Sequence, residues 1–390
     1  MAAHASFGGS TIERRMNCLA SHALEAAAPE PPTSKWAATG TMQHAFIQRC
    51  LEEEKSPQEF IGHKEEGVVL TAGHAADIER AIETFEHLLD DHNVRNYDLI
   101  TEARVRYKGI PAFGTCDVIA RTENCVFVLD WKFGKGVMVQ GGPSNQQLRF
   151  YAGAAMETLP EYFAGDVEIH LGIIQPAADT PLTEGIIARA VLEDWVANMR
   201  ADVKKALDGD VGDPVPGKWC RWCKAAPTCP AKRSQVETAL SFNPRDGVID
   251  PIELGQMYAQ ANAVEEWAKA VKSTAFNELK KGRKVEGFKL VEGRRTRKWD
   301  NEDEACAALL EAGINEVFEQ KLISPHQAEK KVKSAGGDPK EFADLIVSNP
   351  PGLTIAPADD KRPAVFENGL RNASLEDLNL NHLNTEFKNR

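Results

Sequence analysis

Four consecutive apolar residues, Val126 to Leu129, restrict the fold of this chain more than any other segment. A polar turn, Arg121 to Asn124, precedes the run, and the charged residue Asp130 follows it. A short apolar run between polar residues is typical of a β-strand that is buried on both faces. Such a strand requires a sheet with helices packed against both of its sides.

The segments around this run have the periodicities that such a sheet requires. Alternating or apolar patterns predict strands at 101–108, 112–120, 126–132 and 167–175, and at the beginning of 183–207. Apolar residues at helical spacing predict helices at 10–28, 36–54, 65–91 and 144–159, and in the rest of 183–207. The sequence therefore predicts an α/β fold, with a central mixed β-sheet flanked by helices.

The length of 390 residues is enough for two domains. We expect a first domain over 10–235 and a mainly helical extension over 240–365, which contains a hairpin near 284–299. The residues from 366 to 390 are polar, and we expect them to form a disordered tail. No apolar run is long enough for a membrane span, and the first ten residues do not resemble a signal peptide.

The chain carries a net charge of −12, which argues against a protein coated by nucleic acid. The charge is uneven, however, because residues 280–298 carry nine Lys or Arg and two Glu. Such a stretch can bind a polyanion locally, and it can also be an ordinary solvated face.

Three charged residues converge at the end of the apolar strand. Asp130 and Lys132 are two residues apart and point to the same face, and Asp117 lies on the neighbouring strand across a short turn. Burying two carboxylates and an ammonium is costly unless something compensates, and a divalent cation such as Mg²⁺ does so. A metal held there would activate water against a phosphodiester, with the lysine assisting. The alternative is a surface Asp–Lys pair.

Two further features accompany this group. Gln147 and Tyr151 lie four residues apart on one predicted helix face, where both can contact DNA, although Ser144 and Gln147 also fit a capping box. His44, on an earlier helix, can supply one more metal ligand, or it can have a purely structural role.

Three cysteines, Cys220, Cys223 and Cys229, have the C-x₂-C-x₅-C spacing of metal ligands. Three thiolates are one short of a closed tetrahedral site, so the spacing alone predicts zinc with an unidentified fourth ligand. The other cysteines, at 50, 116, 125 and 306, fit no ligand pattern, and we expect them to be small buried residues.

Taken in order, these motifs resemble the PD-(D/E)XK nuclease superfamily, and within it the RecB-type domain of CRISPR-associated adaptation nucleases and phage exonucleases. The resemblance covers about residues 10–235 and implies a restriction-endonuclease-like core. It implies that Mg²⁺ or Mn²⁺ is held by His44, Asp117, Asp130 and the backbone carbonyl of Trp131. It also implies a catalytic Lys132 and a DNA channel lined by Gln147 and Tyr151.

The resemblance also changes the interpretation of the cysteines. Many RecB-type domains hold a [4Fe–4S] cluster with one upstream cysteine and three downstream ones, and Cys18 occupies the upstream position. This implies a structural cluster on Cys18, Cys220, Cys223 and Cys229, with zinc as the alternative because four thiolates suit both.

The expected function is a metal-dependent DNA exonuclease that acts at DNA ends in phage or bacterial recombination or repair. The alternative is a catalytically silent DNA-binding scaffold with the same fold. The resemblance further implies a cytoplasmic protein of phage or prophage origin that binds no membrane and works beside a single-strand annealing protein. Basic residues near the cysteines and in the hairpin are expected to contact DNA phosphates, in particular Arg221, Lys224, Arg294, Arg295 and Arg297.

Overall fold

The computed structural model describes residues 5–30, 35–134, 138–241, 251–289, 366–367 and 370–371. Internal contacts divide the chain into two compact units, Met1–Glu292 and Gly293–Arg390. Within the second unit, the described residues form one antiparallel pair, β8 (Phe366–Glu367) with β9 (Leu370–Arg371). The predicted helical extension from residue 290 to 365, including the second part of its hairpin, lies outside the described residues, and so does the rest of the predicted tail.

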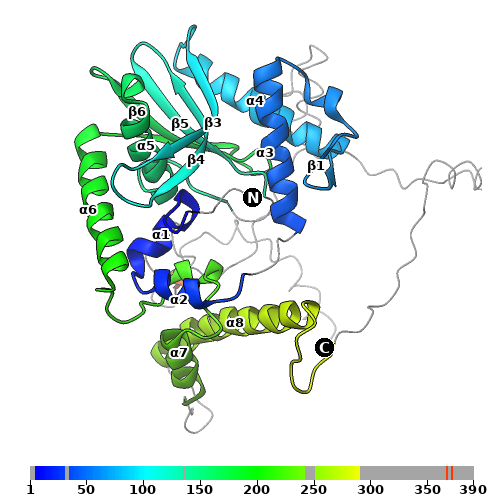
Figure 1. Ribbon diagram of the computed structural model, residues 1–390, viewed down its shortest axis with the longest axis vertical. Coiled ribbons are helices and arrows are strands. Elements are labelled where there is room, and N and C mark those ends of the chain that lie inside the picture. Colours follow the sequence, from blue (N-terminus) through cyan, green and yellow to red (C-terminus); the bar gives the residue numbers. More distant parts are fainter. Residues whose placement is uncertain are drawn as a thin grey trace, which may run out of the picture. The chain divides into compact units, whose positions relative to one another are not determined.

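A five-stranded mixed sheet forms the centre of the first unit (Figure 1). Its spatial order is β3 (Asp98–Arg106), β4 (Phe113–Arg121), β5 (Cys125–Trp131), β6 (Glu168–Ile174) and β7 (Leu182–Ile187). β5 and β6 are parallel, whereas the other neighbours are antiparallel. The parallel pair requires a crossover, which contains helix α5 (Gln146–Thr158). The predicted mixed α/β fold is therefore confirmed.

The other helices surround this sheet or continue beyond it in the sequence. Their bounds are α1 (Gly9–Asn17), α2 (Ser21–Ala27), α3 (Lys35–Glu53), α4 (Ala72–Asp91), α6 (Arg189–Asp208), α7 (Pro230–Ser241) and α8 (Pro251–Lys280). Three 3₁₀ turns are η1 (Pro57–Phe60), η2 (Pro160–Phe163) and η3 (Lys218–Trp222).

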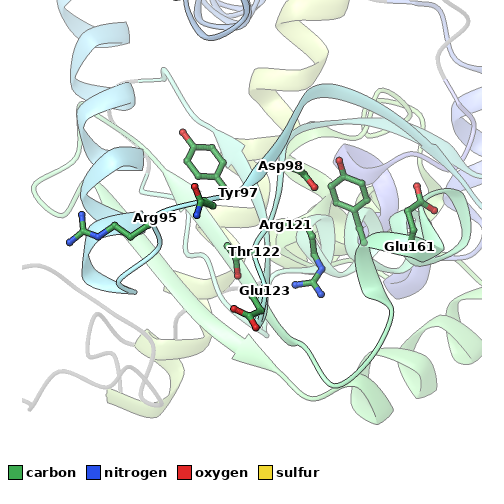
Figure 2. Close-up of a pocket in the computed structure, with 9 residues that line it drawn as sticks. Arg95, Tyr97, Asp98, Arg121, Thr122, Glu123 and Glu161 are labelled. Carbon is green, nitrogen blue, oxygen red and sulfur yellow. The ribbon is translucent and has the colours of Figure 1, made fainter.

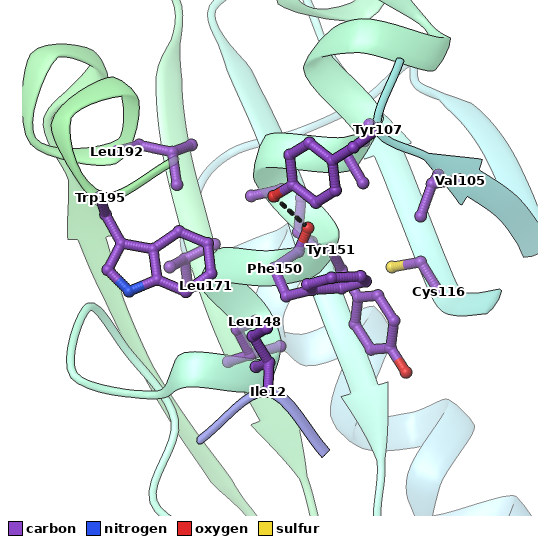
Figure 3. Packing of buried hydrophobic residues seen from close by; sticks show 14 of the residues in the cluster. Ile12, Val105, Tyr107, Cys116, Leu148, Phe150, Tyr151, Leu171, Leu192 and Trp195 are labelled. Atoms are coloured by element: carbon purple, nitrogen blue, oxygen red, sulfur yellow. Dashed lines mark hydrogen bonds between the residues drawn. The ribbon is translucent and has the colours of Figure 1, made fainter. Parts of the chain in front are cut away.

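Side chains of β5 alternate between two apolar cores, one on each face of the sheet. Val126 and Val128 join the core that α1, α5 and α6 cover, whereas Phe127, Leu129 and Trp131 join the core under α3 and α4. Figure 3 shows part of the first core, where the hydroxyl of Tyr107 donates a 2.9 Å hydrogen bond to the carbonyl of Phe150. Burial on both faces explains the continuous apolar run in the sequence.

Two predicted helices differ from the observed ones. The segment predicted as a helix from 65 begins instead with a small hairpin, β1 (Lys64–Glu65) and β2 (Val68–Val69), and α4 starts only after Thr71. Glu66 and Gly67 both have positive φ, 49° and 77°, which is the type I′ turn of a two-residue hairpin. The first predicted helix is divided into α1 and α2, because the backbone at Cys18 leaves the helical region.

The substitution Gly153→Ala in α5 is expected to destabilise the protein by about 1–3 kcal/mol. An added Cβ would lie less than 3.0 Å from the Tyr107 hydroxyl and from Val196, so both would have to move. Gly40→Ala in α3 is the matched control, because nothing lies within 4 Å of its added Cβ, and a gain of about 0.5–1 kcal/mol is expected there. Urea unfolding measures both, and equal midpoints would contradict this account.

Candidate functional site

The two aspartates predicted from the sequence lie where β4 and β5 separate. The last recorded pair of this ladder is Val118 with Leu129, so Asp117 and Asp130 follow it directly, one on each strand. Asp117 is 7% exposed and Asp130 is 2% exposed. Two carboxylates are thus buried beside each other, just beyond the last paired residues of β4 and β5.

Asp130 is contacted by both predicted polar partners. Its Oδ1 accepts a 2.8 Å hydrogen bond from Gln147 Nε2, and its Oδ2 lies 2.5 Å from Lys132 Nζ in an ion pair. Both oxygens of this buried carboxylate therefore have a polar partner. Burial raises the pKa of Asp130 to about 6, although Lys132 pulls it down.

Asp117 is held by a backbone group and by His44. Its Oδ2 accepts a 2.7 Å hydrogen bond from the backbone nitrogen of Trp131, and its Oδ1 lies 3.4 Å from His44 Nδ1. Burial lowers the pKa of His44, but the nearby carboxylates, above all Asp117, raise it to about 10. In the absence of a metal, the protonated imidazole therefore acts as the counterion of the acids.

Glu102 of β3 belongs to this group, although the sequence analysis did not select it. Its Oε1 lies 3.6 Å from His44 Nδ1, and ligand atoms of Glu102, His44 and Asp117 all lie within 4.8 Å of one another. The pairs on either side of it place Glu102 opposite Asp117, and its φ of 48° is unusual for a side-chain-bearing residue. Counting the hairpin register outward from the turn would have found it.

Gln147 and Tyr151 complete the network on helix α5. Gln147 Nε2 also contacts the Tyr151 hydroxyl at 3.2 Å, and its Oε1 accepts from Lys132 Nζ at 3.3 Å. The capping box considered for Gln147 is wrong, because Asn145 is the N-cap and accepts from the backbone nitrogen of Leu148. The amide of Gln147 is thereby free to hold Asp130 and Lys132 in fixed relative positions.

The donor set fits a hard divalent cation. Three carboxylates and one ammonium carry a formal charge of −2 when His44 is neutral, which one divalent ion would cancel. Carboxylate oxygens are the ligands that Mg²⁺ and Mn²⁺ prefer, and Asp117 and Asp130 bury two such groups beside each other. These buried acidic and histidine groups can therefore bind a metal ion.

All four predicted cysteines line one small pocket. Cys18, at the break between α1 and α2, faces Cys220, Cys223 and Cys229 from the segment around η3. Backbone nitrogens of Val215 and Gly217 lie 3.4 Å from the sulfurs of Cys18 and Cys220, to which they donate. The structure thus brings together residues whose contact spans 197 positions in the sequence.

Buried cations surround these thiols. Arg14 and Lys232 also line the pocket and are 9% and 3% exposed. The buried Glu25 pairs with Arg14 and Arg15, and its Oε1 accepts a 2.9 Å hydrogen bond from the backbone nitrogen of Lys224. Burial, together with Glu25, raises the pKa of the Cys223 thiol to about 12. Arg14 only partly offsets this effect, so the Cys223 thiol is neutral unless it binds a metal.

The basic residues expected at DNA phosphates have varied surroundings. Arg221 is exposed beside the Trp222 ring, and Lys224 pairs with Glu30. Lys232, which the sequence groups with them, is buried against the cysteines and lies 3.3 Å from Glu266, so it does not face solvent. Arg294, Arg295 and Arg297 lie outside the described residues.

Of the other cysteines, Cys50 and Cys116 are buried as expected, and Cys125 is half-buried. Cys306 lies outside the described residues.

A separate hollow lies beside the β4–β5 turn and the start of β3 (Figure 2). Its lining mixes cations with carboxylates, namely Arg95 and Arg121 with Asp98, Glu123 and Glu161. It contains none of the residues of the buried acidic group, and its mixed charge favours no one class of ligand.

A comparison with family models places the chain in a known family. The model of a family described as "Protein of unknown function (DUF2800)" matches residues 4–363. Among the described residues, no helix is long and apolar enough to cross a membrane.

Proposed function

Because the chain belongs to the DUF2800 family, whose description assigns no function, we propose one from the site itself: a metal-dependent deoxyribonuclease. The exonuclease mode, at DNA ends in phage or bacterial recombination or repair, follows from the resemblance to RecB-type PD-(D/E)XK nucleases. The observation that carries the proposal is the contact of Asp117, Asp130 and Lys132 with His44 and Gln147 at one end of the sheet.

Asp117, Asp130, Glu102 and His44 would hold Mg²⁺ or Mn²⁺, with the Trp131 carbonyl as a further predicted ligand. Such an ion polarises a phosphodiester and lowers the pKa of water. His44 would lose its proton when it becomes a ligand. The metal would then replace the imidazolium as the counterion of the acids. The physical basis of this assignment is charge: with His44 neutral, the group carries a formal charge of −2, which one divalent ion would cancel.

Lys132 would act beside the acids, where negative charge develops on the phosphate during cleavage. Burial lowers the pKa of Lys132, but Asp130 and Asp117 together raise it overall, so the side chain stays charged. A fixed ammonium in a buried site stabilises developing charge without reorganisation. Gln147 fixes the position of this ammonium, and Tyr151 in turn contacts Gln147.

The four pocket cysteines would hold a [4Fe–4S] cluster rather than a single zinc. Thiolates around one zinc lie about 3.8 Å apart, given Zn–S bonds of about 2.3 Å. Among the described residues, the groups with ligand atoms within 4.8 Å of one another include no three of these cysteines. In a cubane each thiolate binds a different iron, so wider spacing suits it. Arg14 and Lys232 would balance its negative charge.

Digestion of end-labelled linear and circular DNA tests the proposed activity. The full-length protein is incubated with Mg²⁺, with Mn²⁺ or with a chelator. Loss of label from linear DNA that requires the metal is expected, whereas circular DNA should survive if the enzyme is an exonuclease. DNA binding without cleavage in either metal would favour the silent scaffold and overturn the enzymatic assignment.

The substitution Gln147→Leu is expected to reduce cleavage by about 5–150-fold, corresponding to the 1–3 kcal/mol cost of leaving a buried acceptor unsatisfied. Asp130 Oδ1 would lose its donor, and Lys132 would lose the oxygen that fixes its position. Gln146→Leu on the same helix is a control, since the Gln146 side chain contacts Trp195 rather than the acids. Equal single-turnover rates for the two variants would show that Gln147 has no positioning role.

A further inference from the structure

A second group of metal-ligating side chains lies outside the acidic site. His92 follows the last residue of α4, His170 is in β6, and Glu184 is in β7. Ligand atoms of these three residues all lie within 4.8 Å of one another. Two imidazoles and a carboxylate from three separate chain segments thus lie close together.

His170 is the unusual member of this group. It is 1% exposed, yet neither of its ring nitrogens makes a hydrogen bond among the described residues. Leaving a buried polar group without a partner is costly, so such a side chain calls for a ligand. A metal-free pairing of His92 with Glu184 leaves each nitrogen of His170 with a carboxylate oxygen at 3.6 Å, which is beyond hydrogen-bond distance.

The distances are those of a first coordination shell. His92 Nε2 lies 3.0 Å from Glu184 Oε1, and His170 Nδ1 lies 3.6 Å from Glu184 Oε2. Two ligands at about 2.0–2.1 Å from a tetrahedral zinc are about 3.4 Å apart, and the two observed distances fall on either side of that value.

The surroundings of His170 also match a metal ligand. Its second nitrogen, Nε2, lies 3.6 Å from Glu168 Oε2, and metal-bound histidines commonly donate this other N–H to a carboxylate. The ring of Phe127 packs against both imidazoles, with centroids 4.6 Å from His170 and 5.2 Å from His92.

We propose that His92, His170 and Glu184 form a second metal site, specific for Zn²⁺ and separate from the acidic site. Two imidazoles and one carboxylate suit zinc better than Mg²⁺, which prefers oxygen ligands alone. The metal would join the end of α4 to β6 and β7. Three protein ligands leave a fourth position for water. Glu168 would orient His170 through its other ring nitrogen, Nε2.

Zinc binding to the chelator-stripped full-length protein tests this site. Zn²⁺ is titrated against a chromophoric competitor, and Glu184→Gln and His92→Gln are compared with the wild-type protein. Each variant should bind one zinc fewer, or bind that zinc more than about 100-fold more weakly. Glu168→Gln should keep the zinc count and lose about 10–100-fold in affinity, as expected for an outer-shell partner.

Two measurements separate this site from the others. His87→Gln, on the exposed face of the same helix, is the matched control and should bind as wild type. Substituting Co²⁺ should give visible bands without sulfur charge transfer at this site, and those bands should be missing in Glu184→Gln. Zinc counts and affinities that are the same in wild type, His92→Gln and Glu184→Gln, each folded by circular dichroism, would overturn the proposal.

Discussion

Asp130→Asn is expected to reduce DNA cleavage by about 10³-fold or more. The substitution keeps the shape of the side chain but removes the charge that Lys132 contacts and that the proposed metal would contact. Single-turnover cleavage of linear DNA at saturating Mn²⁺ measures the effect. DNA affinity in the presence of a chelator should change little, which separates lost chemistry from lost binding.

The same variant should be more stable than the wild-type protein when metal is absent. Burial raises the pKa of Asp130, which means that the folded protein disfavours the charged form. A neutral amide removes that penalty and still accepts from Gln147, while Lys132 turns from the amide NH2 group to its other acceptor, the Gln147 oxygen. Thermal unfolding with a chelator present is therefore expected to show a higher Tm for Asp130→Asn, the trade-off between stability and activity that is typical of active sites.

Asp166→Asn is the control for both measurements, because Asp166 is exposed in the loop before β6. It should leave cleavage and Tm unchanged. If Asp130→Asn cleaves within tenfold of wild type while Asp166→Asn behaves normally, the acidic group at the end of β4 and β5 is not a hydrolytic centre.

The strands were predictable because their causes are local. The apolar run of β5 marks burial on both faces, and the short turn before it fixes β4 as its neighbour, which places Asp117 beside Asp130. The start of α4 was not predictable from the same rules, because Glu66 occupies a turn position that Asn or Asp usually fills. The apolar periodicity of α4 continues into the hairpin residues, so the predicted helix began too early.

The limits of prediction at the sites have a different origin. Glu102 looks like an ordinary outward-facing strand residue until the register with β4 is known. His92, His170 and Glu184 have no spacing in common, since each comes from a different element and only packing brings them together. Sequence patterns identify sites whose ligands are close in the chain, whereas sites assembled by tertiary contacts require coordinates.

Cys18 is the exception, since the family resemblance linked it to cysteines far along the chain and the structure brings them to one pocket. Cys18→Ser is expected to lose the proposed iron–sulfur cluster. A serine hydroxyl is a poor ligand for iron, and the remaining three thiols leave one corner open.

Cys18→Ser should also lower the free energy of unfolding by a large amount. A bond that joins Cys18 to residues around Cys220 closes a loop of about 200 residues, and a covalent link of that length contributes on the order of 5 kcal/mol. Helices α1 and α2 would then keep their apolar contacts, the Glu13–Lys218 ion pair and the hydrogen bond from the Lys224 backbone to Glu25. Iron content, absorbance near roughly 400 nm and urea unfolding of the anaerobically purified protein measure the three consequences.

Cys50→Ser provides the matched control, because Cys50 is as buried as Cys18, at 4% against 7% exposed, and lies in α3 away from the pocket. It should keep its iron and lose only the small stability that a buried hydroxyl costs. If Cys18→Ser retains full iron and absorbance, Cys18 is not a ligand. A wild-type protein that contains one zinc and no iron would instead make the pocket a zinc site, with the four thiolates around a single ion.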